Sequence, residues 1–184
     1  MSDDTAAKDH PFDVAQKEAR AKLRARLGET ATRLAKHTGD VQGLKERIEA
    51  LGFGGDASKV FDLLPLVHVA WADGGIQAGE RVAILNLLTI RGIGPGEAWT
   101  VMETLLEERP TKDYLEASLD LLRDVLADRQ DDGRTVVGLC ILIAESAGGF
   151  LGIRSISKSE KEMIQKIADR LGAKAQAEFH ARLG

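Results

Sequence analysis

Four acidic residues flank two Gly-Gly pairs, and they are the strongest candidates for chemistry in this sequence. They are Asp73 and Glu80 around the first pair and Glu145 and Glu160 around the second. Carboxylates brought close together repel one another, and a divalent cation that prefers oxygen ligands would offset this repulsion. The pattern therefore predicts a divalent-cation site, of unspecified metal, provided that the two Gly-Gly regions fold against each other.

The same acids also have a structural interpretation. Ser157-x-x-Glu160 is a capping-box pattern, in which the glutamate ties down a helix N-terminus, and Gln77-x-x-Glu80 is a weaker counterpart. Asp73 would accept backbone N–H groups of the loop that it begins. Capping and metal binding both remain open as roles for these residues.

Other kinds of chemistry find little support. Arg154 and Lys158 give the long loop after the second Gly-Gly pair a positive edge, which is the only indication of anion binding. His68 lies in an apolar run and is interpreted as a buried core histidine. No nucleophile lies beside a base, and neither zinc-ligand spacing nor a nucleotide fingerprint is present, so no enzymatic activity is expected.

A helical hairpin must position the first pair of acids. Residues 60–71 are apolar on nearly every face, which predicts a buried helix at the centre of the domain, with Pro65 tolerated if it falls in the first turn. The glycines of Asp73-Gly74-Gly75 end this helix, because glycine permits the left-handed backbone of a helix C-terminus. Residues 80–91 then carry apolar side chains at helical spacing and predict the second helix.

The hairpin pattern returns near the C-terminus. A second apolar helix over residues 136–144 leads into the second Gly-Gly pair, and after a six-residue insertion the spacing resumes so that Glu160 matches Glu80. The match fails at one acid, because Ala147 stands where the first copy has Asp73, so one ligand of a symmetrical site is missing. The repeat predicts two hairpins packed around a pseudo-twofold axis.

The remaining elements are also predicted to be helical. They are expected over residues 12–27, 30–51 with a restart at Asp40, 97–108 and 113–129, while Asp131-Asp132-Gly133 should break the chain before the second buried helix. No segment alternates with period two, so the fold class is all-α: a helical bundle of two pseudo-twofold-related hairpins with an N-terminal helical extension. Residues 1–52 are expected to form a disordered lead and this charged extension, and residues 53–184 the domain.

Composition restricts the class further. Of the 184 residues 29% are charged and 4% aromatic, which is typical of a charge-coated helical protein, and a net charge of −4 argues against nucleic acid as a partner. No apolar segment has the length of a membrane span and the N-terminus lacks a secretory signal, so a cytoplasmic location is expected. Residues 17–36 carry +5 and residues 97–132 carry −7. Three interpretations remain open: the two segments contact each other, each forms a solvated helix face, or the basic segment binds an acidic partner or a lipid surface.

The pattern A-x-A-D-G-G-I-x-x-x-E runs from Ala70 to Glu80 and, with its degenerate second copy, resembles the tellurite-resistance TerB-like proteins. The resemblance covers roughly residues 57–172, and the same module is similar to a region of some membrane-anchored J-domain co-chaperones. It implies a TerB-like helical bundle with acidic clusters in these loops. It also implies protein partners and a tellurite or stress response, often beside a membrane complex.

Two functions follow as expectations. The first is a cytoplasmic TerB-like protein-interaction module with a divalent cation between the loops of the repeats, able to self-associate through its N-terminal helices. The second is a dedicated metal-ion sensor or buffer, for which the four carboxylates are the reason for the fold.

Overall fold

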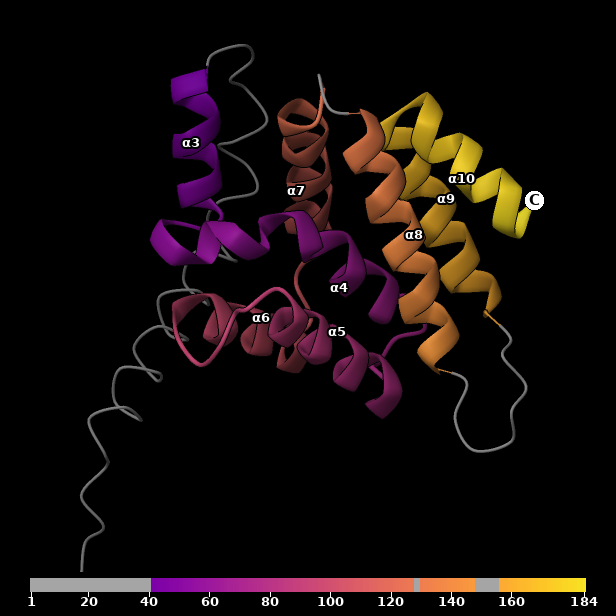
Figure 1. Cartoon of the computed structure of the whole chain (residues 1–184), viewed down its shortest axis with the longest axis horizontal. Coiled ribbons are helices and arrows are strands. Elements are labelled where there is room, and N and C mark those ends of the chain that lie inside the picture. Colours follow the sequence, from indigo (N-terminus) through magenta and orange to yellow (C-terminus); the bar gives the residue numbers. More distant parts are fainter. Residues whose placement is uncertain (1–40, 128–129, 148–155) are drawn as a thin grey trace, which may run out of the picture.

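The structure is a computed structural model that describes residues 41–127, 130–147 and 156–184. All regular elements in these ranges are helical, and Figure 1 shows their arrangement. The α-helices are α3 (Val41–Ala50), α4 (Leu64–Ala70), α5 (Ala78–Ile90), α6 (Glu97–Glu107), α7 (Lys112–Val125), α8 (Gln130–Ala147), α9 (Lys158–Leu171) and α10 (Ala173–Leu183). A 3-10 helix, η1 (Gly55–Leu63), runs directly into α4. The predicted all-α fold class is confirmed.

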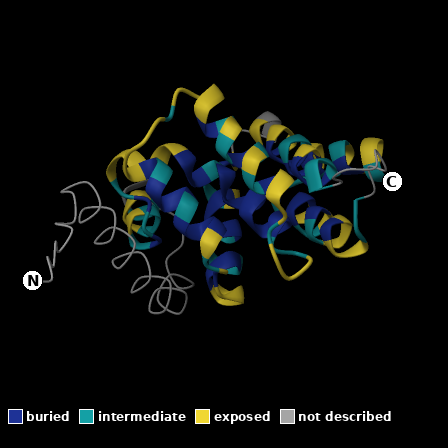
Figure 2. Ribbon diagram, turned by 90° about the horizontal axis from the view of Figure 1, so that it is seen from below, coloured by how far each residue is buried: buried dark blue, intermediate teal, exposed yellow. Residues whose placement is uncertain are grey.

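The segment formed by η1 and α4 lies at the centre of the molecule. Every residue of α4 is buried, and Figure 2 shows buried residues gathered in the middle of the bundle. The buried helix predicted over residues 60–71 is present, but its type changes within this range: the chain is 3-10 helical up to Leu63 and α-helical from Leu64 to Ala70. Pro65 accounts for the change, since it lies in the first turn of α4, where a missing N–H breaks no helical hydrogen bond.

Within the described ranges, α4 packs against helices from both predicted hairpins and against α7. It contacts α5, α7, α8 and α9, while α10 packs on α8 and α9, and α6 packs on η1 (Figure 1). Leu66, Ile84 and Ile164, from three of these helices, are fully buried in one hydrophobic core, whose apolar burial drives folding. The sequence analysis did not assign α10, which begins directly after Gly172, a residue with a φ of 99°.

α8 begins earlier than predicted. Asp131, Asp132 and Gly133 were expected to break the chain, yet all three lie within α8. Gly133 is buried, and a Cβ atom there would lie 3.3 Å from the carbonyl oxygen of Leu171. This glycine therefore permits α8 to pack closely against the end of α9, and the turn that separates α7 from α8 begins earlier, at residues 126–127.

The described part of the N-terminal extension packs on the domain. The hydroxyl of Tyr114 in α7 donates a buried hydrogen bond to the carbonyl of Leu51, and Arg47 of α3 pairs with Asp124 of α7 at 3.1 Å. Phe53, the first residue of the predicted domain, is fully buried. The helix predicted over residues 12–27 and the first part of the one predicted over residues 30–51 lie outside the described residues, and the division at residue 52 stays a prediction.

α5 packs closely against α8 at Gly79. A Cβ atom on Gly79 would lie 2.2 Å from the carbonyl oxygen of Ser146, whereas a Cβ on Gly75 would have no atom within 4 Å. We expect Gly79→Ala to destabilise the protein by about 1–3 kcal/mol, because backbone must move to relieve the clash, and Gly75→Ala to change stability by less than about 0.5 kcal/mol. Urea unfolding of both variants measures the difference, and equal stabilities would contradict the close contact.

Candidate functional site

The two hairpins meet where α5 and α9 begin. Gly79, in the first turn of α5, lies against the backbone of Ser146 at the end of α8. In the other direction, Ser157 and Ser159 at the start of α9 both donate hydrogen bonds to Asp73 Oδ1 after α4, the Ser157 bond at 2.7 Å. Ser159 is the repeat equivalent of Gly79, so the same position of each hairpin contacts the other hairpin, although the partner residues are not equivalent. The pseudo-twofold relation of the complete hairpins stays a prediction.

Glu80 and Glu160 each cap the N-terminus of their own helix. The backbone N–H of Gln77 donates to Glu80 Oε2 at 2.7 Å, and the backbone N–H of Ser157 donates to Glu160 Oε2, also at 2.7 Å. In α9 the box is reciprocal, because the Ser157 hydroxyl accepts from the Glu160 N–H at 3.1 Å. The capping interpretation is therefore confirmed for both glutamates, and it leaves one oxygen of each carboxylate unused by the cap.

Packing also brings these two glutamates together. Both are only 2% exposed, and the pKa of Glu80 is raised to about 7. Burial is the largest cause; the Gln77 N–H acts in the opposite direction, while the charge and hydrogen bonding of Glu160, and more weakly Asp73, raise the pKa further. Glu160 Oε1 is buried, and while both carboxylates are ionised no N–H or O–H group in the described part of the chain donates to it. A proton on Glu80 or a cation between the carboxylates would give that oxygen a partner.

Of the four predicted acidic ligands, the structure brings three near one another. Asp73 is exposed at the edge of the pair and is held by two serines, while Glu145 is half-buried on α8 with no contact that links it to the other acids. Within the described ranges, no group of three or more His, Cys, Asp or Glu side chains is arranged to hold a metal ion. The cluster is therefore a glutamate pair with a neighbouring aspartate.

The predicted positive edge is only partly described. Arg154 lies outside the described residues, and Lys158 is exposed at the start of α9, where it pairs with Glu162 at 3.7 Å. The sequence analysis recognised Ser157 as a cap but missed its bond to Asp73, together with that of Ser159. The repeat alignment held a signal for this contact, because it places a serine hydroxyl opposite Gly79.

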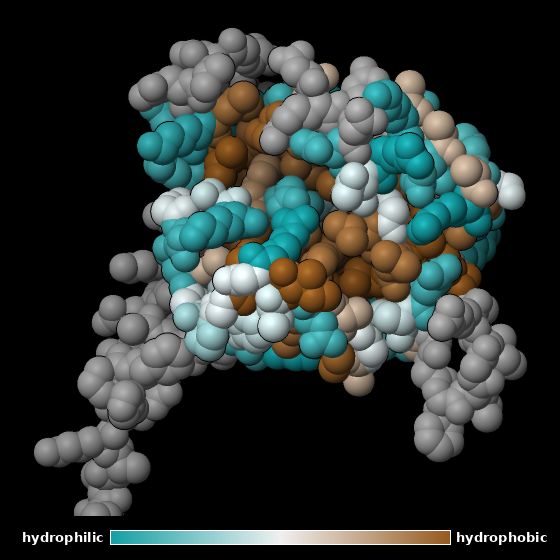
Figure 3. All heavy atoms as spheres, viewed as in Figure 1, coloured by the Kyte–Doolittle hydropathy of each residue, from teal (hydrophilic) through white to brown (hydrophobic). Residues whose placement is uncertain are grey.

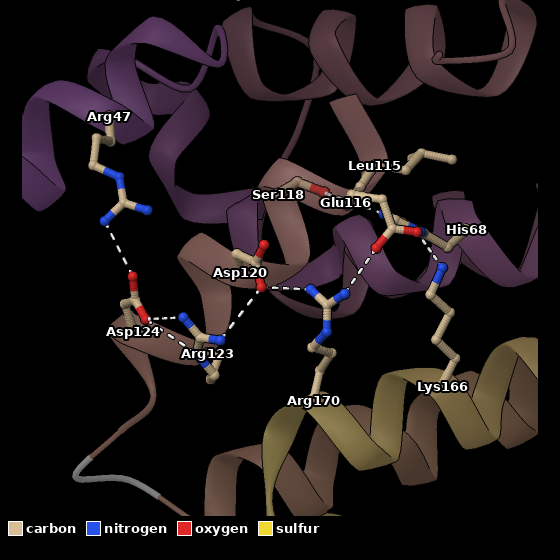
Figure 4. A network of polar contacts seen from close by, with 10 residues as sticks. All are labelled: Arg47, His68, Leu115, Glu116, Ser118, Asp120, Arg123, Asp124, Lys166 and Arg170. Atoms are coloured by element: carbon tan, nitrogen blue, oxygen red, sulfur yellow. Dashed lines mark hydrogen bonds and ion pairs between the residues drawn. The ribbon is translucent and has the colours of Figure 1, made fainter. Parts of the chain in front are cut away.

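A second cluster of charged side chains, which the sequence analysis missed, joins α7 to α9 and α3 (Figure 4). Its members alternate in sign in the order Lys166, Glu116, Arg170, Asp120, Arg123, Asp124 and Arg47. Partial burial of Glu116 would raise its pKa, but Lys166 and Arg170 together lower it. The signal was present in the sequence as matching i,i+4 pairs, acidic on α7 and basic on α9. This network is compensated, unlike the glutamate pair.

His68 is a buried polar residue near this network. Its Nε2 atom lies 3.1 Å from the hydroxyl of Ser118, which itself donates to the carbonyl of Leu115 at 2.8 Å. Since the serine proton is already used, the imidazole must be the donor at Nε2. The structural role predicted for His68 is confirmed.

The fold and the glutamate pair define a class of protein: a small all-α bundle in which two helical hairpins meet at their capping glutamates. The family model for Tellurite resistance protein TerB matches residues 63–183, well over half of the chain, and the chain belongs to the TerB family. Comparison with curated proteins and with solved structures finds no significant match.

The raised pKa of Glu80 predicts how stability depends on pH. The folded protein holds this proton up to about pH 7, while the unfolded chain releases it near 4.5. The stabilisation is therefore fully present below 4.5 and is lost as the pH rises to about 7. Glu80→Gln keeps an oxygen for the Gln77 N–H and offers an amide donor to Glu160. In chelated buffer at pH 8 we expect it to be more stable than the wild type by roughly 1–2 kcal/mol.

Urea unfolding of wild type and Glu80→Gln between pH 5 and pH 8.5 measures this effect as the difference between the two proteins. Glu162→Gln is the matched control, because Glu162 is exposed and, among the described residues, forms an ion pair only with Lys158, one helical turn away. A difference that does not change with pH, or that appears equally in the control, would show that Glu80 does not titrate as stated.

Proposed function

We propose that this TerB-family chain is a protein-interaction module of a tellurite or stress response, and that Glu80 and Glu160 bind a divalent cation that joins its two hairpins. The observation that carries the proposal is the buried, unpartnered Oε1 atom of Glu160 beside a second buried carboxylate. Capping uses the other oxygen of each glutamate, so the uncapped oxygens are the ones available to a cation.

The donor set favours a hard cation. Both groups are carboxylates, and neither a cysteine nor a histidine joins them within the described residues. Magnesium is held in proteins by as few as one or two carboxylates and keeps several waters, whereas calcium needs six to eight oxygen ligands. Magnesium or manganese therefore fits the pair better than calcium or zinc. When bound, the cation would supply charge neutralisation at the contact of α5 with α9.

Exposed apolar side chains support the interaction role. Val82, Ile90 and Leu142 are 57%, 81% and 51% exposed, and the first two lie on the same helix, α5. Figure 3 shows apolar surface extending over the middle of the face that carries α4 and α8. Apolar surface of this kind is a common feature of protein contact sites. The partner and its membrane association belong to the proposal, as do the cytoplasmic location, the absence of catalysis and self-association through the N-terminal helices.

Within the described ranges, no helix is both long and apolar enough to cross a bilayer. Any association with a membrane complex would on this proposal be made through a protein partner.

The second candidate function is a metal-ion sensor or buffer. It is favoured by the position of the glutamates, because Glu80 begins α5 in one hairpin and Glu160 begins α9 in the other. A cation shared by them would act directly on the contact between the hairpins. A sensor would change that contact on binding, whereas an interaction module would only be stabilised by it.

Calorimetry with magnesium, manganese, calcium and zinc at pH 8 tests the cation. We expect binding of manganese or magnesium and an increase in the thermal unfolding temperature, because bound cation stabilises the folded state. Both effects should weaken at pH 5.5, where Glu80 holds its proton. The variant Glu80→Gln/Glu160→Gln should lose them, while Glu145→Gln, which removes an acid without a contact to the pair, should keep them.

The two candidate functions and the biological setting separate in further measurements. Saturable binding together with large chemical-shift changes at the start of α5 and α9 would favour the sensor. Saturable binding with changes confined to Glu80 and Glu160 would favour the interaction module. No heat and no thermal shift with any of the four metals would reject the cation.

A host strain that lacks the chain should regain growth on tellurite with the wild type, and failure to do so would reject the proposed setting.

A further inference from the structure

A cleft of about 400 Å³ lies between α4, the start of α7 with the connection that precedes it, and α9, and neither glutamate of the pair lines it. Its volume falls within the range of protein pockets that enclose small organic molecules. Pro110, Leu115 and Met163 contribute its apolar wall. Leu115 is buried and Met163 half-buried, so the wall continues from the surface into the core.

The basic groups of the cleft are not all compensated. Arg109 and Lys112 are exposed and form no ion pair with another residue of the described ranges. The third, Lys166, is already paired with Glu116, whose carboxylate also accepts from Arg170 at 2.9 Å. Two cations thus remain for an anion that enters the cleft. Figure 4 shows the paired side, with Lys166 and Glu116 beside His68.

The inner part of the cleft is uncharged. His68 lines it and is 2% exposed, and its Nε2–H is directed to Ser118. Burial, and secondarily the charge of Lys166, lowers the pKa of His68 to about 3, so the ring is neutral at physiological pH. An anion therefore finds favourable charge only near Arg109 and Lys112, whereas the interior suits an apolar group. Met163 is unbranched and adapts its shape to such a group.

We propose that this cleft binds a small organic monocarboxylate, with its carboxylate at Arg109 and Lys112 and its apolar body against Leu115, Met163 and His68. Arginine and lysine donate charge-assisted hydrogen bonds to carboxylates, and the apolar body leaves water on binding. An inorganic anion satisfies only the first of these interactions, and a neutral alcohol only the second. The site involves neither glutamate of the pair and is independent of the proposed function.

Titration of the ¹⁵N-labelled full chain with hexanoate, hexanol and sulfate tests the site. Hexanoate should shift the amide signals of Leu115 and Met163 in a saturable manner. Hexanol should bind at least several-fold more weakly, and sulfate should leave both signals in place. Sulfate shifts equal to those of hexanoate, or hexanoate shifts that do not saturate, would overturn the proposal in favour of general surface charge.

The double variant Arg109→Gln/Lys112→Gln should weaken hexanoate binding by roughly tenfold, because two charged donors are removed. Lys161→Gln removes a cation from the exposed surface of α9 outside the cleft and should bind as the wild type does. If the double variant does not fold, raising the salt concentration gives a second test, since screening should weaken hexanoate binding to the wild type several-fold. Unchanged affinity in the folded double variant, or no effect of salt, would overturn the proposal.

Discussion

The structure depends on a conflict between local and long-range interactions at Glu80 and Glu160. Each glutamate stabilises its own helix, because it caps the backbone and places negative charge at the positive end of the helix dipole. Packing of the two hairpins then places both carboxylates in one buried location, where like charges repel. Each capping interaction is favourable for its own helix, but placing both carboxylates together is unfavourable. Conflicts of this kind between local and long-range interactions are found mainly at functional sites.

Near the opposite end of α9, partly buried charges are paired with charges of the opposite sign. Lys166 and Arg170 follow one another at i,i+4 and face Glu116 and Asp120, which have the same spacing on α7. Alternation of sign makes that contact favourable with no added ion. At the N-terminus of α9, by contrast, Glu160 meets another acid and keeps an oxygen without a partner. α9 therefore meets α7 through charges of opposite sign near its C-terminus and α5 through two carboxylates at its N-terminus.

What the sequence predicted correctly depends on short-range interactions. The capping glutamates, the ends of α5 and α6 and the buried state of α4 could be predicted, because spacing within one turn or one helix determines them. Gly133 was misinterpreted as a helix break because its role depends on Leu171, which is distant in the sequence. The bond of Asp73 to Ser157 and Ser159 was missed for the same reason. Convergence of the glutamates was predicted only because the internal repeat gives long-range information.

The contacts of Asp73 give the asymmetry of the repeat a structural reason. The presence of Ala147 in the second copy suggested a missing metal ligand, on the assumption that Asp73 is itself a ligand. In the structure Asp73 accepts hydrogen bonds from the two serines that begin α9, while the corresponding contact in the other direction is a backbone approach to Gly79. The two contacts between the hairpins thus differ in kind: one uses hydrogen bonds to the Asp73 carboxylate, and the other is a close backbone contact that uses no acid. The groups that both copies retain are Glu80 and Glu160, and these are the two that we propose to bind the cation.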